Sequence, residues 1–198
     1  MTAVLAARIG PNAITQVAAA LDGSLGDGAA APFLRGVGLG AYVSSPPQDM
    51  VDEWEVIALH GAVREQLAPD AAQRIARMAG LATAQYLLAH RIPAAAQRLL
   101  KTLPAAWASR ALLKAIGRHA WTFAGSGQFR AEPGTPVVIT LSNCPLARNV
   151  RSDSPVCDYY AATFEGLFQA LVHPQATVVE TRCQSMGASE CRFEISWP

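Results

Sequence analysis

The hydrophobic pattern of this chain changes near residue 120, and that change restricts the possible folds more than any other feature. Before residue 120, apolar side chains recur at three- and four-residue spacing, as at Ile75, Met78 and Ala82, which is the period of an amphipathic helix. After it, short runs rich in Val, Ile and Thr are separated by turn residues, which is typical of strands. Helices followed by strand, strand, helix, strand and strand predict an α+β fold with a small antiparallel sheet packed on helices.

Proline and glycine divide the first part of the chain. Residues 22–50 are rich in Gly, Ser and Pro, and this composition predicts a loop or an irregular arm. Helices are predicted over residues 12–22, 51–67, 69–91, 93–103 and 104–120. We therefore expect an N-terminal helix and arm in residues 1–50 and a single domain in residues 51–198, with a helical part, 51–119, and a sheet part, 120–198.

The sheet part is predicted from short apolar runs and turn signals. Strands are predicted over residues 120–130, 135–143, 176–183 and 190–197. Residues 154–172 predict a helix, with Ser154 as its N-cap and Pro155 at its first position. The last two strands are expected to form a hairpin.

Composition and charge exclude some classes of function. Hydrophobic residues make up 51% of the chain, which is typical of a globular protein. A net charge of +1 gives no bulk electrostatic reason to bind nucleic acid, and no basic stripe interleaved with aromatic residues is present. We therefore expect no nucleic-acid partner.

No segment of the sequence has the features of a membrane span or a signal peptide. The apolar N-terminus lacks a basic region and is interrupted by Pro11. The most apolar later stretch, residues 78–90, is about half the length needed to cross a bilayer. We expect a cytoplasmic protein, with contact with a membrane surface left open.

All four cysteines lie in the last 55 residues, each at the edge of a predicted element. Cys144 follows a strand, and Cys157 falls in the first turn of a helix, where the helix dipole favours the thiolate. Cys183 and Cys191 lie at the facing ends of the predicted hairpin. Such ends can converge on one point in space.

Three interpretations of this cluster compete. Disulfides require an oxidising compartment, and the sequence gives no sign of export. Unrelated buried thiols that pack as small apolar side chains are the second interpretation. A zinc site is favoured, because thiolates are soft ligands and zinc takes about four ligands in tetrahedral geometry.

From about Trp121 to Trp197 the chain resembles the 4-vinyl-reductase domain. This small-molecule-binding module is similar to the ligand-sensing domain of phenol-responsive bacterial regulators and to a vesicle-tethering subunit fold. In the phenol sensors a zinc ion is held by Cys, Glu, Cys and Cys. This chain carries the same residue types at the same spacing, with 22, 2 and 7 residues between successive positions: Cys157, Glu180, Cys183 and Cys191. The resemblance therefore implies a closed, structural zinc site.

Glu180 and Cys183 are three residues apart, which presents a geometric difficulty. On a regular strand, residues three apart point to opposite faces, so both side chains could not reach one metal ion. We expect the strand to end or to bulge before Cys183. If it does neither, Cys144 becomes the better fourth ligand and the site is all-cysteine.

Over its full length the chain resembles the protein J family of bacteriochlorophyll biosynthesis in purple phototrophs. The resemblance rests on residues 8–21, on the Ala-rich helices and on the spaced residues of the last part. The family name implies reduction of the C8 (formerly "4") vinyl group of a chlorophyll precursor. The glycine run at residues 36–40 follows no clear strand, and no two cysteines are closer than eight positions, so neither a dinucleotide site nor an iron–sulfur site is predicted. Enzymatic activity is therefore left uncertain, and a role without catalysis is favoured.

The resemblance implies binding of a tetrapyrrole, of the protoporphyrin or magnesium-protoporphyrin type, by a carrier in bacteriochlorophyll biosynthesis. An apolar wall with a few polar anchors suits a flat macrocycle. The candidate ligand-binding residues are His119, Trp121, Trp107, Tyr86 and Trp54. The alternatives are an 8-vinyl reductase and a sensor domain for a small aromatic compound.

The partners are also implied by the resemblance. They are the magnesium chelatase porphyrin-binding subunit, the magnesium-protoporphyrin methyltransferase and a second copy of this chain in a homodimer. The implied location is cytoplasmic, with a peripheral position on the photosynthetic membrane as the alternative.

Overall fold

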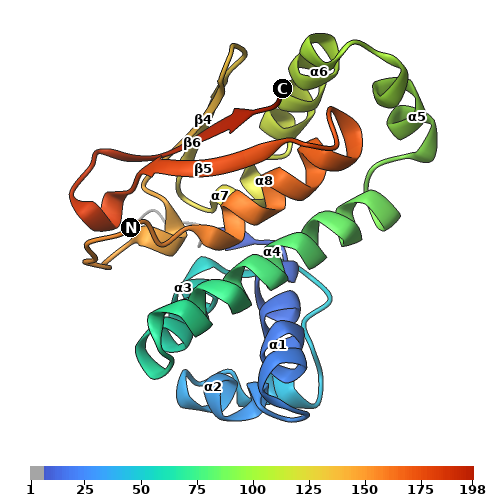
Figure 1. Ribbon diagram of the computed structural model, residues 1–198. Coiled ribbons are helices and arrows are strands. Elements are labelled where there is room, and N and C mark those ends of the chain that lie inside the picture. Colours follow the sequence, from blue (N-terminus) through green and yellow to red (C-terminus); the bar gives the residue numbers. More distant parts are fainter. Residues whose placement is uncertain (1–6) are drawn as a thin grey trace, which may run out of the picture.

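A computed structural model describes residues 7–198 of the chain (Figure 1). The α+β class predicted from the sequence is confirmed. None of the helices in this range is both long enough and apolar enough to cross a membrane. The elements in chain order are β1 (Arg8–Ile9), α1 (Asn12–Leu25), α2 (Ala30–Gly36), η1 (Gly40–Val43), β2 (Val51–Asp52), α3 (Glu53–Gln66), α4 (Pro69–His90), α5 (Ala94–Thr102), α6 (Ala105–Arg118), α7 (Trp121–Ala124), β3 (Gln128–Glu132), β4 (Val137–Ser142), η2 (Pro145–Ala147), α8 (Asp158–Leu171), β5 (Thr177–Arg182), η3 (Gln184–Met186) and β6 (Glu190–Ser196).

The larger sheet has the strand order β3-β4-β6-β5, and every neighbouring pair is antiparallel, as predicted. Side chains along each strand point alternately to the two faces of the sheet, so that one face is buried and the other is exposed to solvent. Ile139 on β4, Phe193 on β6 and Val178 on β5 are buried on the inner face. This period of two follows from the alternation of side chains along a strand.

Helices cover the inner face of the sheet in two layers. Helix α8 lies directly on it, where Phe164 meets Phe193 edge to face with ring centroids 5.5 Å apart. Helix α4 crosses α8, and α1, α2 and α3 gather on its far side (Figure 1). The crossing is close: a Cβ atom on Gly80 would clash with the carbonyl of Tyr159 and lie 2.8 Å from Cβ of Ala162. Glycine at this position therefore sets how near the helical part comes to the sheet part.

The segment predicted as an irregular arm, residues 22–50, contains a helix. Helix α1 continues to Leu25, and α2 follows after a short turn in which Asp22 Oδ1 accepts a hydrogen bond of 2.8 Å from the N–H of Ala30. Phe33 and Leu34 bury one side of α2. The Gly and Pro content indicated the turns correctly but concealed this seven-residue helix. The division of the chain at residue 50 stays a prediction.

The strand predicted over residues 120–130 is wrong in its first half. Residues 121–124 form α7, and the strand begins at Gln128. Thr122 is β-branched, which suggested a strand, but its hydroxyl donates to the carbonyl of His119 at 2.8 Å and so closes a helical turn. Gly125, with φ +57°, then ends α7.

Helix α8 begins later than predicted. Its N-cap is Cys157 and its first residue is Asp158, so the predicted cap, Ser154, lies outside it. Ser154 instead lies in a turn, where its N–H donates a hydrogen bond of 3.2 Å to Oγ of Ser152. The shift matters because it places a cysteine at the exact start of the helix.

His60 is buried where α3 meets α1 and α8. Its Nε2 lies 3.1 Å from the carbonyl oxygen of Ala13, so this nitrogen carries the proton in the neutral ring. The ring also meets Tyr159 edge to face, at 5.2 Å between centroids. Burial, together with the charge of Arg64, lowers the pKa of His60 to about 3.

Acid should therefore destabilise the fold through His60. The pKa is near 6.5 in the unfolded chain and about 3 in the folded one, so the stability is fully present above pH 6.5 and is lost as the pH falls toward 3. We expect the free energy of unfolding to drop by about 3 kcal/mol more in wild type than in His60→Gln between pH 7 and pH 4. Urea unfolding at both pH values measures this, and equal losses in the two proteins would contradict it.

Candidate metal centre

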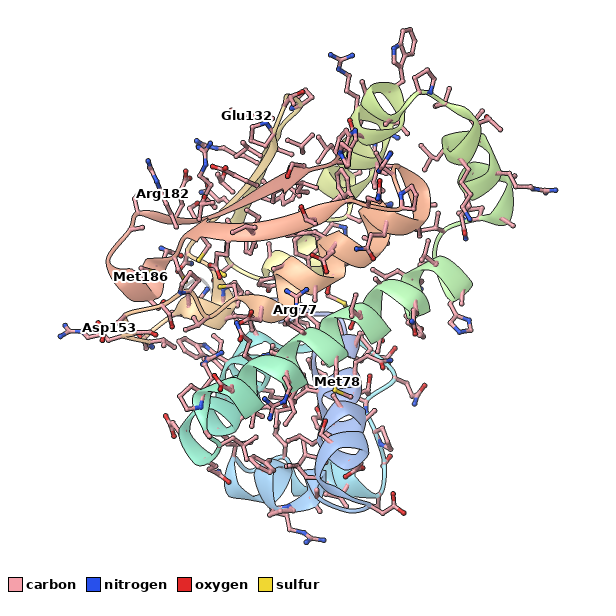
Figure 2. The ribbon with its side chains drawn as sticks, viewed as in Figure 1. Arg77, Met78, Glu132, Asp153, Arg182 and Met186 are labelled. Carbon is pink, nitrogen blue, oxygen red and sulfur yellow. The ribbon has the colours of Figure 1, made fainter. Side chains whose placement is uncertain are left out.

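Four side chains that can bind a metal meet where α8 begins beside the sheet. Cys157 is the N-cap of α8, Glu180 lies in β5, Cys183 follows β5, and Cys191 lies in β6. The three sulfurs are fully buried. Together with a carboxylate oxygen of Glu180 they all lie within 4.8 Å of one another. Figure 2 shows sulfur atoms gathered between the strands and the loop that carries Met186.

A bulge in β5 allows Glu180 and Cys183 to reach the same point. Glu180 pairs with Phe193 on β6, but Arg182 pairs with the next residue, Arg192, so the register shifts between them. The strand then ends at Arg182. The sequence required an end or a bulge before Cys183, and the structure has both.

The distances between the sulfurs match a tetrahedral metal site. Sγ of Cys157 lies 3.9 Å from that of Cys183 and 3.6 Å from that of Cys191, and the last two sulfurs are 3.6 Å apart. A zinc ion with Zn–S bonds of about 2.3 Å requires sulfurs about 3.8 Å apart in a tetrahedron. These three residues and Glu180 therefore fit zinc in both ligand type and spacing.

The carboxylate of Glu180 is only half satisfied by hydrogen bonds. Its Oε2 accepts from the N–H of Cys157 at 2.8 Å. Its Oε1 is buried and has no hydrogen-bond partner within residues 7–198. A buried acceptor without a partner is costly, and a cation bound between Oε1 and the sulfurs would remove that cost.

Donors in the loop after β5 point at the sulfurs. The hydroxyl of Ser185 donates to Sγ of Cys183 at 3.1 Å, and the N–H of Gln184 donates to Sγ of Cys191 at 3.5 Å. Hydrogen bonds of this kind orient metal ligands and stabilise their anionic form. Gly187, with φ +89°, makes the turn that follows η3 and brings the chain back to β6.

Crowding and burial shift the protonation of the cluster. Burial, with the nearby charge of Cys183, raises the pKa of Glu180 to about 8. Burial also raises the pKa of Cys157. Burial opposes ionisation of Cys144 as well, but hydrogen bonds from Cys157 and Cys191 outweigh it and lower the pKa of Cys144 to about 5. Burial thus disfavours the charged forms of Glu180 and Cys157, and a bound cation would favour them instead.

The fourth cysteine lies beside this set. Sγ of Cys144 is 3.6 Å from that of Cys157, and its backbone N–H donates to Oε1 of Gln184 at 2.6 Å. The group of mutually close donors includes Glu180 and leaves Cys144 out. The geometry thus favours Glu180 over Cys144 as the fourth donor.

Comparison with known proteins agrees with this placement. The V4R domain model matches residues 137–196, which include all five of these side chains. The chain is 44% identical over 96% of its length to the bacteriochlorophyll synthase 23 kDa chain of Cereibacter sphaeroides, covering 91% of that protein. It is 39% identical over 95% of its length to the protein of the same name from Rhodobacter capsulatus, covering 86% of it.

The chain belongs to the family of the bacteriochlorophyll synthase 23 kDa chain. Among solved structures it is similar to an H-NOX protein from a study of heme distortion, with a TM-score of 0.59, 14% identity and coverage of 96% of this chain and 95% of that one. An H-NOX protein from S. oneidensis in the Fe(II)NO state gives a TM-score of 0.53, 12% identity and coverage of 95% and 98%. At such low identity these likenesses show a shared fold.

The five residues expected to bind a flat pigment do not converge on one point. They are Trp54 on α3, Tyr86 on α4, Trp107 on α6, His119 directly after α6 and Trp121 on α7. The three tryptophans are more than half exposed. Helices α3 and α6 lie at opposite ends of the molecule (Figure 1). The role of all five stays a prediction.

A buried ion pair that the sequence did not indicate holds the loop after Cys144. Glu53, at the start of α3, lies 2.7 Å from Nη1 of Arg148 and accepts from both the N–H and the hydroxyl of Ser126. Burial opposes its ionisation, but the bonds from Arg148 and Ser126 outweigh this and lower the pKa of Glu53. Arg148 also covers the ring of Trp54 at 5.4 Å. An acid in the first turn of a helix is ordinarily exposed, so the sequence gave no signal of this contact.

Removing the charge of Glu53 should therefore unfold the protein more easily. Glu53→Gln leaves Arg148 buried without a counter-charge, and we expect a loss of about 3–5 kcal/mol in the free energy of unfolding. Glu194→Gln is the matched control, because its pair with Arg192 lies on the wet face of the sheet, and it should cost less than about 1 kcal/mol. Urea denaturation of the three proteins at pH 7 measures both values. Similar losses of unfolding free energy in the two variants would show that the pair of Glu53 and Arg148 stabilises the fold no more than an exposed ion pair does.

Proposed function

We propose that this chain is a tetrapyrrole-binding carrier in bacteriochlorophyll biosynthesis, with a zinc ion that stabilises its V4R domain. The observation that carries the proposal is the 44% identity to a bacteriochlorophyll synthase chain across 96% of the sequence. The shared fold adds support, since the similar H-NOX structures come from work on heme and on porphyrin distortion. The ligand class is a protoporphyrin or a magnesium-protoporphyrin.

A carrier is favoured over an 8-vinyl reductase by the geometry of the glycine run. Gly36 ends α2, Gly38 has φ +79°, and Gly40 begins η1. The run thus joins two short helices, whereas a dinucleotide-binding loop joins a strand to a helix. These glycines shape a turn and do not form a phosphate cradle.

The proposed zinc ligands are Cys157, Glu180, Cys183 and Cys191. Zinc would supply a strong divalent charge that links the start of α8 to both strands of the terminal hairpin. Four protein ligands close the coordination sphere, so the site is structural and leaves no position for a substrate. Hydrogen bonds from neighbouring residues orient the proposed ligands. Ser185 and Gln184 donate to the sulfurs of Cys183 and Cys191, and the N–H of Cys157 donates to the carboxylate of Glu180.

The proposed pigment contacts are the exposed side chains near α6 and α7. Trp107 and Trp121 offer large apolar surfaces that water now covers, at 65% and 63% exposure. His119 lies between them in sequence and is also exposed, so its imidazole can bind the magnesium of a metalloporphyrin. Trp107 lies near the start of α6, whereas His119 and Trp121 follow its end, and Tyr86 and Trp54 lie on other helices.

The proposed partners follow from the carrier role. A carrier must receive its pigment from one enzyme and pass it to the next, and the family points to the magnesium chelatase porphyrin-binding subunit and the magnesium-protoporphyrin methyltransferase. We also propose a homodimer and a cytoplasmic location, with peripheral contact with the photosynthetic membrane.

Metal analysis tests the zinc site. We expect about one zinc per purified chain and loss of the metal in Cys183→Ser, because that substitution removes a ligand. Ser189→Ala, an exposed change in the same loop, should keep the zinc. Since Cys183→Ser can fail to fold, a chelator is added to wild type in parallel: the melting temperature should fall and return when zinc is restored. If neither the chelator nor added zinc changes the melting temperature of the wild-type protein, the proposal of a structural metal is refuted.

Pigment titration tests the carrier role. Adding magnesium protoporphyrin should shift its Soret band and quench tryptophan fluorescence, and His119→Ala should weaken binding by about tenfold or more through loss of one axial bond. His173→Ala, on the loop between α8 and β5, is the control and should bind as wild type does. Absence of binding to wild type would refute the proposal. If the protein converts a divinyl substrate to a monovinyl product with NADPH, the carrier proposal is wrong and the protein is a reductase.

A further inference from the structure

The metal centre has one donor more than a four-coordinate cation needs. Beside the four proposed ligands lies the buried thiol of Cys144, 3.6 Å from Sγ of Cys157. A closed site takes four ligands, so one of the five donors must stand outside the coordination sphere.

Cys144 and Glu180 are both neighbours of the same ligand, Cys157. Oε2 of Glu180 is bonded to the N–H of Cys157, and Sγ of Cys144 is as near to Sγ of Cys157 as Sγ of Cys191 is, at 3.6 Å. Ligand sulfurs in a tetrahedral site lie about 3.8 Å apart. Cys144 therefore already has the spacing from Cys157 that a bound sulfur requires.

Cys144 also has space beside it. It lines a cavity of about 220 Å³ together with Asn143, Arg148, Gln184 and the 147–150 segment. Of the five donors, Cys144 is the one that lines this cavity. This cavity leaves open space next to Cys144 that the other four donors do not have.

We propose that Cys144 and Glu180 exchange in the fourth position of the metal, an inference that rests on the metal site proposed above. In the exchange, a bond forms between the cation and Sγ of Cys144, and the bond to the carboxylate of Glu180 breaks. The thiol proton of Cys144 passes to the freed carboxylate of Glu180.

The exchange changes what the cation holds together. With Glu180 bound, the cation links α8 and β6 to β5. With Cys144 bound, it links them to the junction of β4 and η2, and four residues further on Arg148 is paired with Glu53 on α3. Both donors carry one negative charge when bound, so the exchange leaves the charge of the centre unchanged. The exchange replaces a metal bond to the terminal hairpin by a metal bond to the segment that Arg148 connects to the helical part.

Cobalt(II), a spectroscopic substitute for zinc, tests the exchange. Thiolate-to-cobalt charge-transfer absorbance rises with the number of Co–S bonds, and soft thiolates bind such cations strongly. Cys144→Ser should show three thiolates, and wild type should show between three and four, because the two donors alternate in the fourth position. Glu180→Gln should still bind one cobalt per chain, with absorbance about one third higher than that of Cys144→Ser, because a fourth thiolate has entered. Glu190→Gln, a neighbouring carboxylate on β6, is the matched control and should match wild type.

The double variant Glu180→Gln, Cys144→Ser gives the decisive comparison. It should lose the added absorbance and bind cobalt about 10–100-fold more weakly than Glu180→Gln alone. Circular dichroism of each protein confirms that the variants are folded, so that weak binding is not mistaken for unfolding.

The outcomes separate this inference from the metal site itself. If wild type binds no cobalt, both fail. If wild type shows three thiolates and Glu180→Gln gains none, the exchange alone is refuted. Four thiolates in wild type, unchanged in Glu180→Gln, would also refute it, because Glu180 would then never hold the position.

Discussion

Three buried thiols and a buried carboxylate share one small volume, and they can ionise there together only if a counter-charge is present. Burying an unpaired anion costs several kcal/mol. The groups that oppose this charge are partial ones: the hydroxyl of Ser185, the N–H of Gln184 and the start of α8 at Cys157. Dipoles of this size orient ligands but do not balance several anions, whereas a divalent cation does. Oε1 of Glu180, which has no hydrogen-bond partner in residues 7–198, lies where such a cation would bind.

The centre depends on packing far from it in sequence. Glycine at position 80 lets α4 approach α8 closely, and this contact fixes the helix whose first turn presents Cys157. The pair of Glu53 and Arg148 then fixes the loop after Cys144 to the start of α3. The V4R match covers residues 137–196, yet these two contacts come from outside it. The family likeness accordingly extends over the whole chain, since the helical part holds the sheet part in place.

The sequence predicted the parts of the site that depend on spacing and missed the parts that depend on local conformation. The resemblance to the phenol sensors, which rests on the intervals between four residues, indicated which side chains meet. The bulge that makes Glu180 and Cys183 compatible was inferred as a requirement and could not be located, since nothing in the residue types near 181 marks it. Helix α7 was missed because it is a single turn of four residues, too short to show a helical period in the sequence. The role of the aromatic residues stays a prediction, because helix faces are set by packing that one sequence does not reveal.

A physical route connects the metal centre with the surface proposed for the pigment. Cys157 begins α8, and one turn further Tyr160 donates its hydroxyl proton to the carbonyl of Phe123 on α7 at 2.7 Å. Phe123 packs edge to face on Phe129 of β3, so α7 is held between α8 and the sheet. Trp121 is two residues from Phe123 on the same short helix. One hydrogen bond and one ring contact therefore join the helix that begins at Cys157 to the short helix that carries Trp121.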